Sequence, residues 1–68
     1  MNTTAKKTID ELTKQELLAY RVELSEYKTR AEQLTAAGRI VSSMWVLHWT
    51  SEDAEYLIKK CGIRPHFG

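Results

Sequence analysis

The chain has 68 residues, room for one small core, and domains of this size usually need a disulfide, a metal or a partner subunit for stability. Its single cysteine, Cys61, excludes a disulfide within the chain and suits a reducing, cytoplasmic compartment. Its net charge of +1 and its mixed charge distribution lack the single-sign field that is typical of binding to nucleic acid or to a membrane surface.

Two threonine–glutamate pairs near the N-terminus have the spacing of capping boxes. In this motif the threonine side chain and the glutamate three residues later accept hydrogen bonds from each other's backbone N–H groups. The pairs are Thr8 with Glu11 and Thr13 with Glu16. The second pair predicts a helix from about residue 14, after a polar tail over residues 1–8 that we expect to be flexible. Residues 9–68 then form a single helical domain.

A heptad pattern of apolar residues occupies the first predicted helix, over residues 14–37. Its members follow one another in steps of three and four: Leu17, Tyr20, Leu24, Tyr27, Ala31 and Leu34. This spacing is typical of a coiled-coil seam and predicts a dimer through these residues. The alternative is a stripe that faces the core of a small helical fold. Leu18 and Val22 lie on a second face, which suggests that the start of the helix also packs against another element.

Gly38 leaves three interpretations of the segment that follows. It can end the first helix as a C′ residue. It can also lie inside one helix that extends to about residue 49, because the heptad continues through it and a helical glycine costs only about 1 kcal/mol. The third interpretation is a strand that pairs with a second copy of the chain, since residues 40–49 include several β-prone side chains. We favour the helix.

A second, short helix is predicted over residues 52–61. Thr50 or Ser51 can cap it, and acidic residues follow in its first turn. Its apolar face consists of Ala54, Leu57, Ile58 and Cys61, and Gly62 with Ile63 matches a common helix ending. The sequence therefore predicts an all-α protein in which this helix packs back on the long one.

No residues have the spacing of a catalytic or metal-binding site. Cys61, His48 and His66 are too scattered for zinc, which takes four ligands in recognisable pairs. Cys61 lies at a helix C-terminus, where the helix dipole disfavours a thiolate. The three glycines form no phosphate-binding loop. We expect a protein that is not an enzyme and uses no cofactor or metal.

Residues 44–49 read Met-Trp-Val-Leu-His-Trp and contain both tryptophans. On a helix this run is apolar on almost every side, more than the short helix can cover. We expect one side to lie in the core and another to bind a second protein, through Met44, Trp45, His48, Trp49 and Phe67. The hypothesis is a small non-catalytic adaptor, inhibitor or assembly factor with an unidentified protein partner, similar in composition to small regulatory proteins of bacteria and their phages.

The alternative hypothesis is a dimeric helix-turn-helix-like transcriptional regulator. Residues 39–49 and 52–61, with a turn between them, have suitable lengths for that motif. However, Glu52, Asp53 and Glu55 at the start of the second helix would repel DNA phosphates. The residues that would contact a DNA backbone are Lys59, Lys60 and Arg64. Nucleic acid is therefore the less favoured partner, and with no apolar stretch of about 20 residues we expect no membrane contact.

Overall fold

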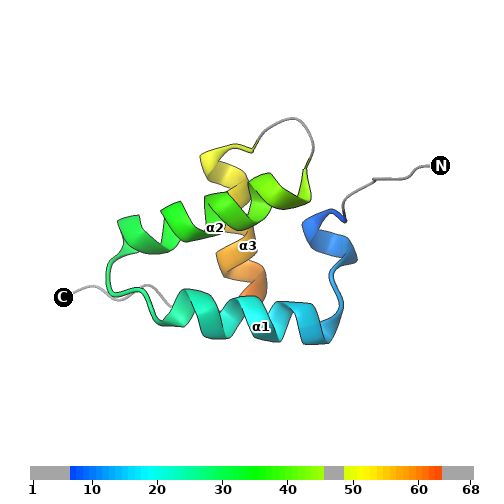
Figure 1. Ribbon diagram of the computed structural model, residues 1–68, viewed down its shortest axis with the longest axis horizontal. Coiled ribbons are helices and arrows are strands. Elements are labelled where there is room, and N and C mark those ends of the chain that lie inside the picture. The colour runs from blue at the N-terminus through cyan, green and yellow to red at the C-terminus, as the bar shows by residue number, and fades with distance from the viewer. Residues whose placement is uncertain (1–6, 46–48, 64–68) are drawn as a thin grey trace.

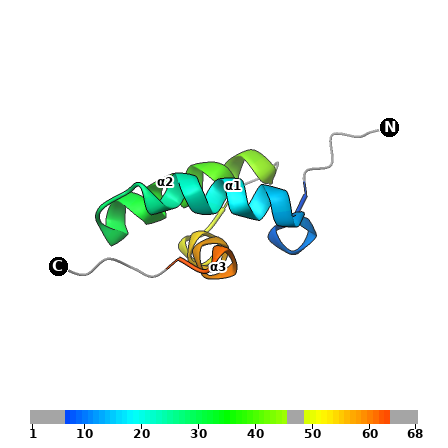
Figure 2. The same ribbon diagram turned by 90° about the horizontal axis from the view of Figure 1, so that it is seen from below.

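The computed structural model describes residues 7–45 and 49–63, and all regular secondary structure in this part of the chain is helical. The elements in chain order are the 3-10 helix η1 (Ile9–Glu11) and the α-helices α1 (Lys14–Ser25), α2 (Arg30–Met44) and α3 (Ser51–Cys61). α1 and α2 lie side by side and run in opposite directions, and α3 crosses both on one face (Figures 1 and 2). The all-α prediction is confirmed, and the short helix packs back on the preceding segment as expected.

The single long helix predicted over residues 14–37 is wrong, because α1 ends at Ser25 and α2 begins at Arg30. The N-cap of α2 is Thr29, whose hydroxyl accepts a hydrogen bond from the Glu32 N–H at 3.1 Å. The Glu32 carboxylate accepts one from the Thr29 N–H, also at 3.1 Å. This third capping box satisfies N–H groups that a new helix would otherwise leave without partners. The heptad residues are consequently divided between two antiparallel helices, with Tyr27 in the turn that joins them.

A buried glutamine fastens the turn between α1 and α2. Gln33 has no exposed surface, and its Nε2 donates a hydrogen bond to the Tyr27 carbonyl oxygen at 3.4 Å. Its Oε1 accepts from Arg30 at 3.5 Å. The Tyr27 hydroxyl in turn accepts from Arg39 at 3.2 Å. A buried amide is tolerated because both of its polar ends have partners, and these partners link the turn to α2.

Gly38 lies inside α2, so the interpretation of this glycine as the helix end is wrong. The helix continues to Met44 and stops there, because Trp45 has an extended backbone with φ −109° and ψ 131°. The extension to residue 49 is therefore also wrong, and residues 40–44 are helix and not strand. A Cβ atom on Gly38 would lie 2.4 Å from two carbons of the Trp49 indole. The missing side chain leaves room for that ring against α2.

α3 begins one residue earlier than predicted, at Ser51, and ends at Cys61 as predicted. The Thr50 hydroxyl accepts from the Asp53 N–H at 3.2 Å, and the Asp53 carboxylate accepts from the Thr50 N–H at 2.9 Å. At the other end Gly62 has φ +78°, and the Ile63 N–H donates to the Ile58 carbonyl oxygen at 3.3 Å. Both helix ends use the chemistry that the sequence predicted.

The core lies where α3 crosses the two antiparallel helices. Every element contributes to it, and η1 supplies Ile9, which is 1% exposed. The largest side chains with almost no exposure are Ile9, Leu24, Gln33, Val41, Leu57 and Ile58. Thr8 caps η1 with Glu11, and residues 1–6 of the expected tail lie outside the described residues.

Candidate protein-binding surface

The residues of the predicted dimer seam face the core of their own chain. Leu24 has no exposed surface, and four others are partly buried against the core: Leu17, Tyr20, Tyr27 and Leu34. Ala31 is the exception, because it is exposed. A continuous seam does not exist, because α1 and α2 fold on each other. The heptad residues therefore agree with the alternative interpretation, a set of apolar residues that faces the core of a small helical fold. The dimer stays a prediction.

The described residues of the run over 44–49 pack on the core. Met44 is buried, and Trp45 and Trp49 are half-buried against the core cluster. Trp49 lies over Gly38, so its ring covers α2. His48 and Phe67, which we expected on the same surface, lie outside the described residues. In the part of the run that the structure describes, one side packs in the core as expected, and the binding of a partner by these residues stays a prediction.

Among the described residues, the two most exposed large apolar side chains are on α1. Leu18 is 58% exposed and Val22 is 56% exposed. Residues four positions apart lie on the same face of a helix, so these two side chains form one continuous stripe. We expected them to pack against another element of the chain, and this expectation is wrong. α1 has one apolar face that packs on the core and a second apolar face that is open, which we call the α1 stripe.

A groove runs beside the α1 stripe, between α1 and the C-terminal end of α3. Its volume is about 340 Å³, and it is lined by Lys14, Leu17, Leu18, Arg21, Lys60 and Cys61. The first four come from α1 and the last two from α3. Because Leu18 belongs to both, the groove and the α1 stripe form one surface. We call the groove by itself, without Val22, the α1–α3 groove.

Cys61 is a structural residue on the floor of this groove. Its side chain is 7% exposed, and the thiol donates a hydrogen bond to the Leu17 carbonyl oxygen at 3.6 Å. Burial raises the pKa of the Cys61 thiol, while the positive charge of Arg21 opposes this shift. The sulfur is therefore a thiol near neutral pH, and its main effect is to pack α3 against α1.

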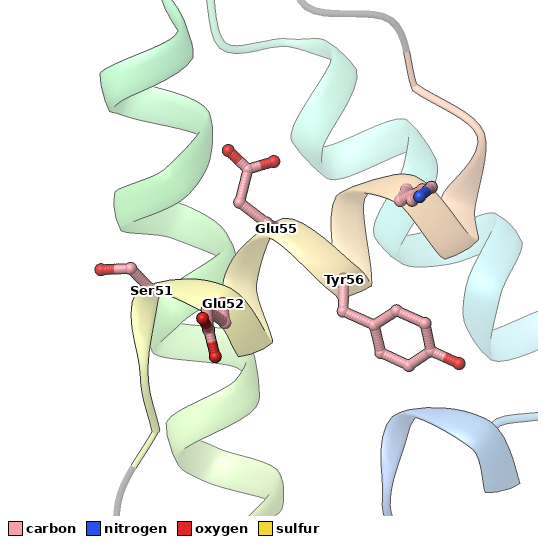
Figure 3. Close-up of a pocket in the computed structure, with 5 residues that line it drawn as sticks. Ser51, Glu52, Glu55 and Tyr56 are labelled. Carbon is pink, nitrogen blue, oxygen red and sulfur yellow. The ribbon is translucent and has the colours of Figure 1, made fainter.

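The outer face of α3 carries a second groove, of about 400 Å³, lined by Ser51, Glu52, Glu55, Tyr56 and Lys59. Figure 3 shows that the Glu55 and Tyr56 side chains leave the helix in different directions and that the Tyr56 ring extends toward η1. Glu55 forms an ion pair with Arg30 of α2. Glu52 and Glu55 are exposed, so the start of α3 presents carboxylates to an approaching DNA phosphate.

Tyr56 belongs to a polar cluster that joins α3 to η1. Its hydroxyl donates a hydrogen bond to the Asp10 carboxylate, and Lys60 Nζ lies 3.4 Å from Asp10 Oδ1. These contacts lower the pKa of Asp10, with the Tyr56 hydrogen bond as the largest cause. The same hydrogen bond raises the pKa of Tyr56. This exposed cluster links η1 to α3.

The basic residues of the alternative hypothesis that the structure describes lie toward the C-terminal end of α3. Lys59 and Lys60 are exposed in its last turn, and Arg64 lies outside the described residues. Within residues 7–45 and 49–63, no three His, Cys, Asp or Glu side chains gather as a metal site requires. In the same part of the chain, no helix combines the length and the apolar character needed to cross a membrane.

Comparison with protein-family models, curated proteins and solved structures finds no significant match to this chain. The site therefore has to be judged on its own geometry. Sequence reasoning noticed Leu18 and Val22 but assigned them to packing, because the heptad directed attention to the other face of the helix. Their position outside the heptad steps was the signal that they belong to a separate face.

Proposed function

We propose that the protein is a small non-catalytic interaction protein, an adaptor, inhibitor or assembly factor, and that it binds its partner protein through the α1 stripe. The observation that carries this proposal is the exposure of Leu18 and Val22, at 58% and 56%, on an ordered helix. Fully burying one large apolar side chain contributes about 1.5–3 kcal/mol relative to leaving it exposed. Two such side chains one turn apart can anchor a helix or groove of another protein.

The chemistry of the described residues supports a binding role over a catalytic one. Cys61 is buried and its pKa is raised, which is the opposite of what a nucleophilic cysteine needs. Asp10, Tyr56 and Lys60 bond to one another across two elements and thereby stabilise the fold. The α1 stripe has no such use within this part of the chain.

Self-association is the competing use of the same surface. A second copy would have to bury the Leu18 and Val22 side chains, since the predicted seam residues pack inward. The mass of the purified protein at tens of micromolar, measured by light scattering, separates the two uses. A monomeric mass supports a different protein as the partner, whereas a dimer that Leu18→Ser/Val22→Ser dissociates assigns the stripe to self-association.

DNA binding is the second candidate, and the crossing of α3 over α2 is the feature that favours it. Two features oppose it. The connection over residues 45–50 is longer than the roughly 3–4-residue turn of a helix-turn-helix. In addition, Glu52 and Glu55 are exposed at the start of α3. If duplex DNA bound with a steep salt dependence, and Lys59→Glu/Lys60→Glu weakened that binding, the DNA hypothesis would replace the proposed function.

The direct test compares two double variants in affinity capture. Leu18→Ser/Val22→Ser removes the stripe, and we expect it to lose a protein that the wild type retains. Ala31→Ser/Ser42→Ala changes exposed positions of α2 and should retain it. Circular dichroism checks that both variants remain helical, which we expect because exposed substitutions usually change stability by less than about 0.5 kcal/mol. Equal capture by both variants would exclude the stripe as the binding surface.

A further inference from the structure

We infer that the α1–α3 groove receives an acidic side chain of the partner protein, held next to an apolar side chain that packs on the α1 stripe. This inference rests on the proposed function and specifies the chemistry of the partner. It identifies the partner segment as an acidic amphipathic one.

The charge of the groove is the first observation. Lys14, Arg21 and Lys60 contribute three positive charges to its lining, and none of the described residues that line it is acidic. Lys60 already has a partner, because Asp10 lies 3.4 Å from its Nζ. Among the residues that the structure describes, the ion pairs involve neither Lys14 nor Arg21. Both are exposed on α1, so their positive charges are available to a carboxylate from another molecule.

The position of Lys14 and Arg21 on the helix is the second observation. At 100° per residue, both lie on the flank of Leu18 that faces the end of α3, while Glu16 and Glu23 lie on the far flank. The groove lining, which joins Lys14 and Arg21 of α1 to Lys60 and Cys61 of α3, agrees with this placement. The basic side of α1 is therefore the side that borders the groove, whereas Glu16 on the far flank forms an ion pair with Lys7.

The apolar part of the groove decides which acidic molecule fits. Leu18 lines the groove and is 58% exposed, and Leu17 and buried Cys61 add apolar surface beneath it. A phosphate backbone would match the cations but would leave Leu18 and Val22 in water. A flat anionic membrane would meet both, but it would also meet the exposed Glu26 next to Val22 on the helical wheel. A helix that places leucine on the α1 stripe and glutamate only on the side of the groove matches the cations and the apolar side chains without presenting a carboxylate to Glu26.

The test titrates isotope-labelled protein with a peptide of repeated Glu-Leu-Leu-Glu sequence and follows the backbone amide signals by NMR. We expect signals of residues 14–22 and 60–61 to shift most, and the shifts to shrink with added salt because exposed charges are screened. A peptide with lysine in place of glutamate should cause no such shifts. Lys14→Gln/Arg21→Gln should weaken binding, by about two- to five-fold for each lost cation.

The matched control for charge is Lys28→Gln/Lys59→Gln, which also removes two exposed cations but leaves the groove lining intact. It should bind the acidic peptide like the wild type. Equal weakening by both pairs, or no shifts with the acidic peptide at millimolar concentration, would overturn the inference. So would stronger binding of duplex DNA or of phosphatidylserine vesicles through the same residues.

The two proposals fail in different ways. If Leu18→Ser/Val22→Ser abolishes capture of a partner and Lys14→Gln/Arg21→Gln leaves it unchanged, the α1 stripe binds a protein but the acidic side chain is excluded. If both pairs leave capture unchanged, the proposed function itself fails.

Discussion

Gly38 provides the sharpest test of how the region between α2 and α3 packs. A Cβ atom at this position would lie 2.4 Å from the Cη2 and Cζ2 atoms of Trp49, well inside normal contact distance. Gly38→Ala therefore has two opposing effects. Alanine favours a helix interior over glycine by about 1 kcal/mol, whereas forcing extra volume into a packed site costs about 1–3 kcal/mol.

The net effect should be a loss of about 1 kcal/mol in the free energy of unfolding, since the rigid Trp49 indole must move away from α2. The matched background is Trp49→Leu, which keeps an apolar side chain but removes the ring atoms above Gly38. In that background Gly38→Ala should stabilise the protein by about 1 kcal/mol, because only the helix-propensity term remains. The sign of the substitution thus depends on Trp49, as expected for two residues in contact.

Urea unfolding followed by circular dichroism measures all four proteins of this cycle, and tryptophan fluorescence reports the displacement of Trp49 as a red shift in Gly38→Ala. If Gly38→Ala stabilises the wild-type protein as much as it stabilises the Trp49→Leu variant, the ring does not lie over α2. The role assigned to this glycine would then be wrong.

Three further predictions concern helix ends and the η1–α3 contact. Thr29→Ala removes the N-cap of α2 and should lower the free energy of unfolding by about 1 kcal/mol, measured by urea unfolding. Gly62→Ala should lower it by about 1–2 kcal/mol in the same assay, because Gly62 has φ +78° and its surroundings are open, so the cost comes from backbone conformation alone. Asp10 has a lowered pKa in the folded protein, so its contribution to stability is present above its ordinary pKa of 3.8 and is lost as the pH falls through the folded value. The urea midpoint of the wild type should therefore fall more steeply below about pH 4 than that of Tyr56→Phe, which lacks the main hydrogen bond to Asp10.

Each of these has a matched control. Thr35→Ala changes an exposed threonine inside α2 and should change the free energy of unfolding by less than about 0.5 kcal/mol. Gly62→Asn should cost less than Gly62→Ala, because asparagine tolerates the left-handed conformation better. Glu23→Gln should keep the wild-type acid slope. Equal losses at Thr29 and Thr35, a neutral Gly62→Ala, or identical acid slopes for the wild type and Tyr56→Phe would each contradict the corresponding contact.

Local chemistry by itself determined the helix ends that the sequence predicted. The Thr8, Thr13 and Thr50 caps and the Gly62 ending need only residues within one turn, so they can be read from spacing. The Thr29–Glu32 box was equally readable, and the heptad obscured it. A heptad pattern of apolar residues can continue across a turn between two helices. The pattern shows which residues are apolar but not where the backbone reverses direction, so it does not reveal the turn.

The tertiary structure alone decided which apolar face of α1 is covered. Leu24 and Leu18 are both leucines on the same helix, and Leu24 is fully buried while Leu18 is 58% exposed. The difference arises because α2 folds back on α1 and α3 crosses both, so the heptad face is covered within the chain and the second face is not. Burial depends on contacts between residues distant in sequence, such as Leu17 with Cys61, and no local pattern contains them. The α1 stripe and the α1–α3 groove exist only as consequences of that arrangement.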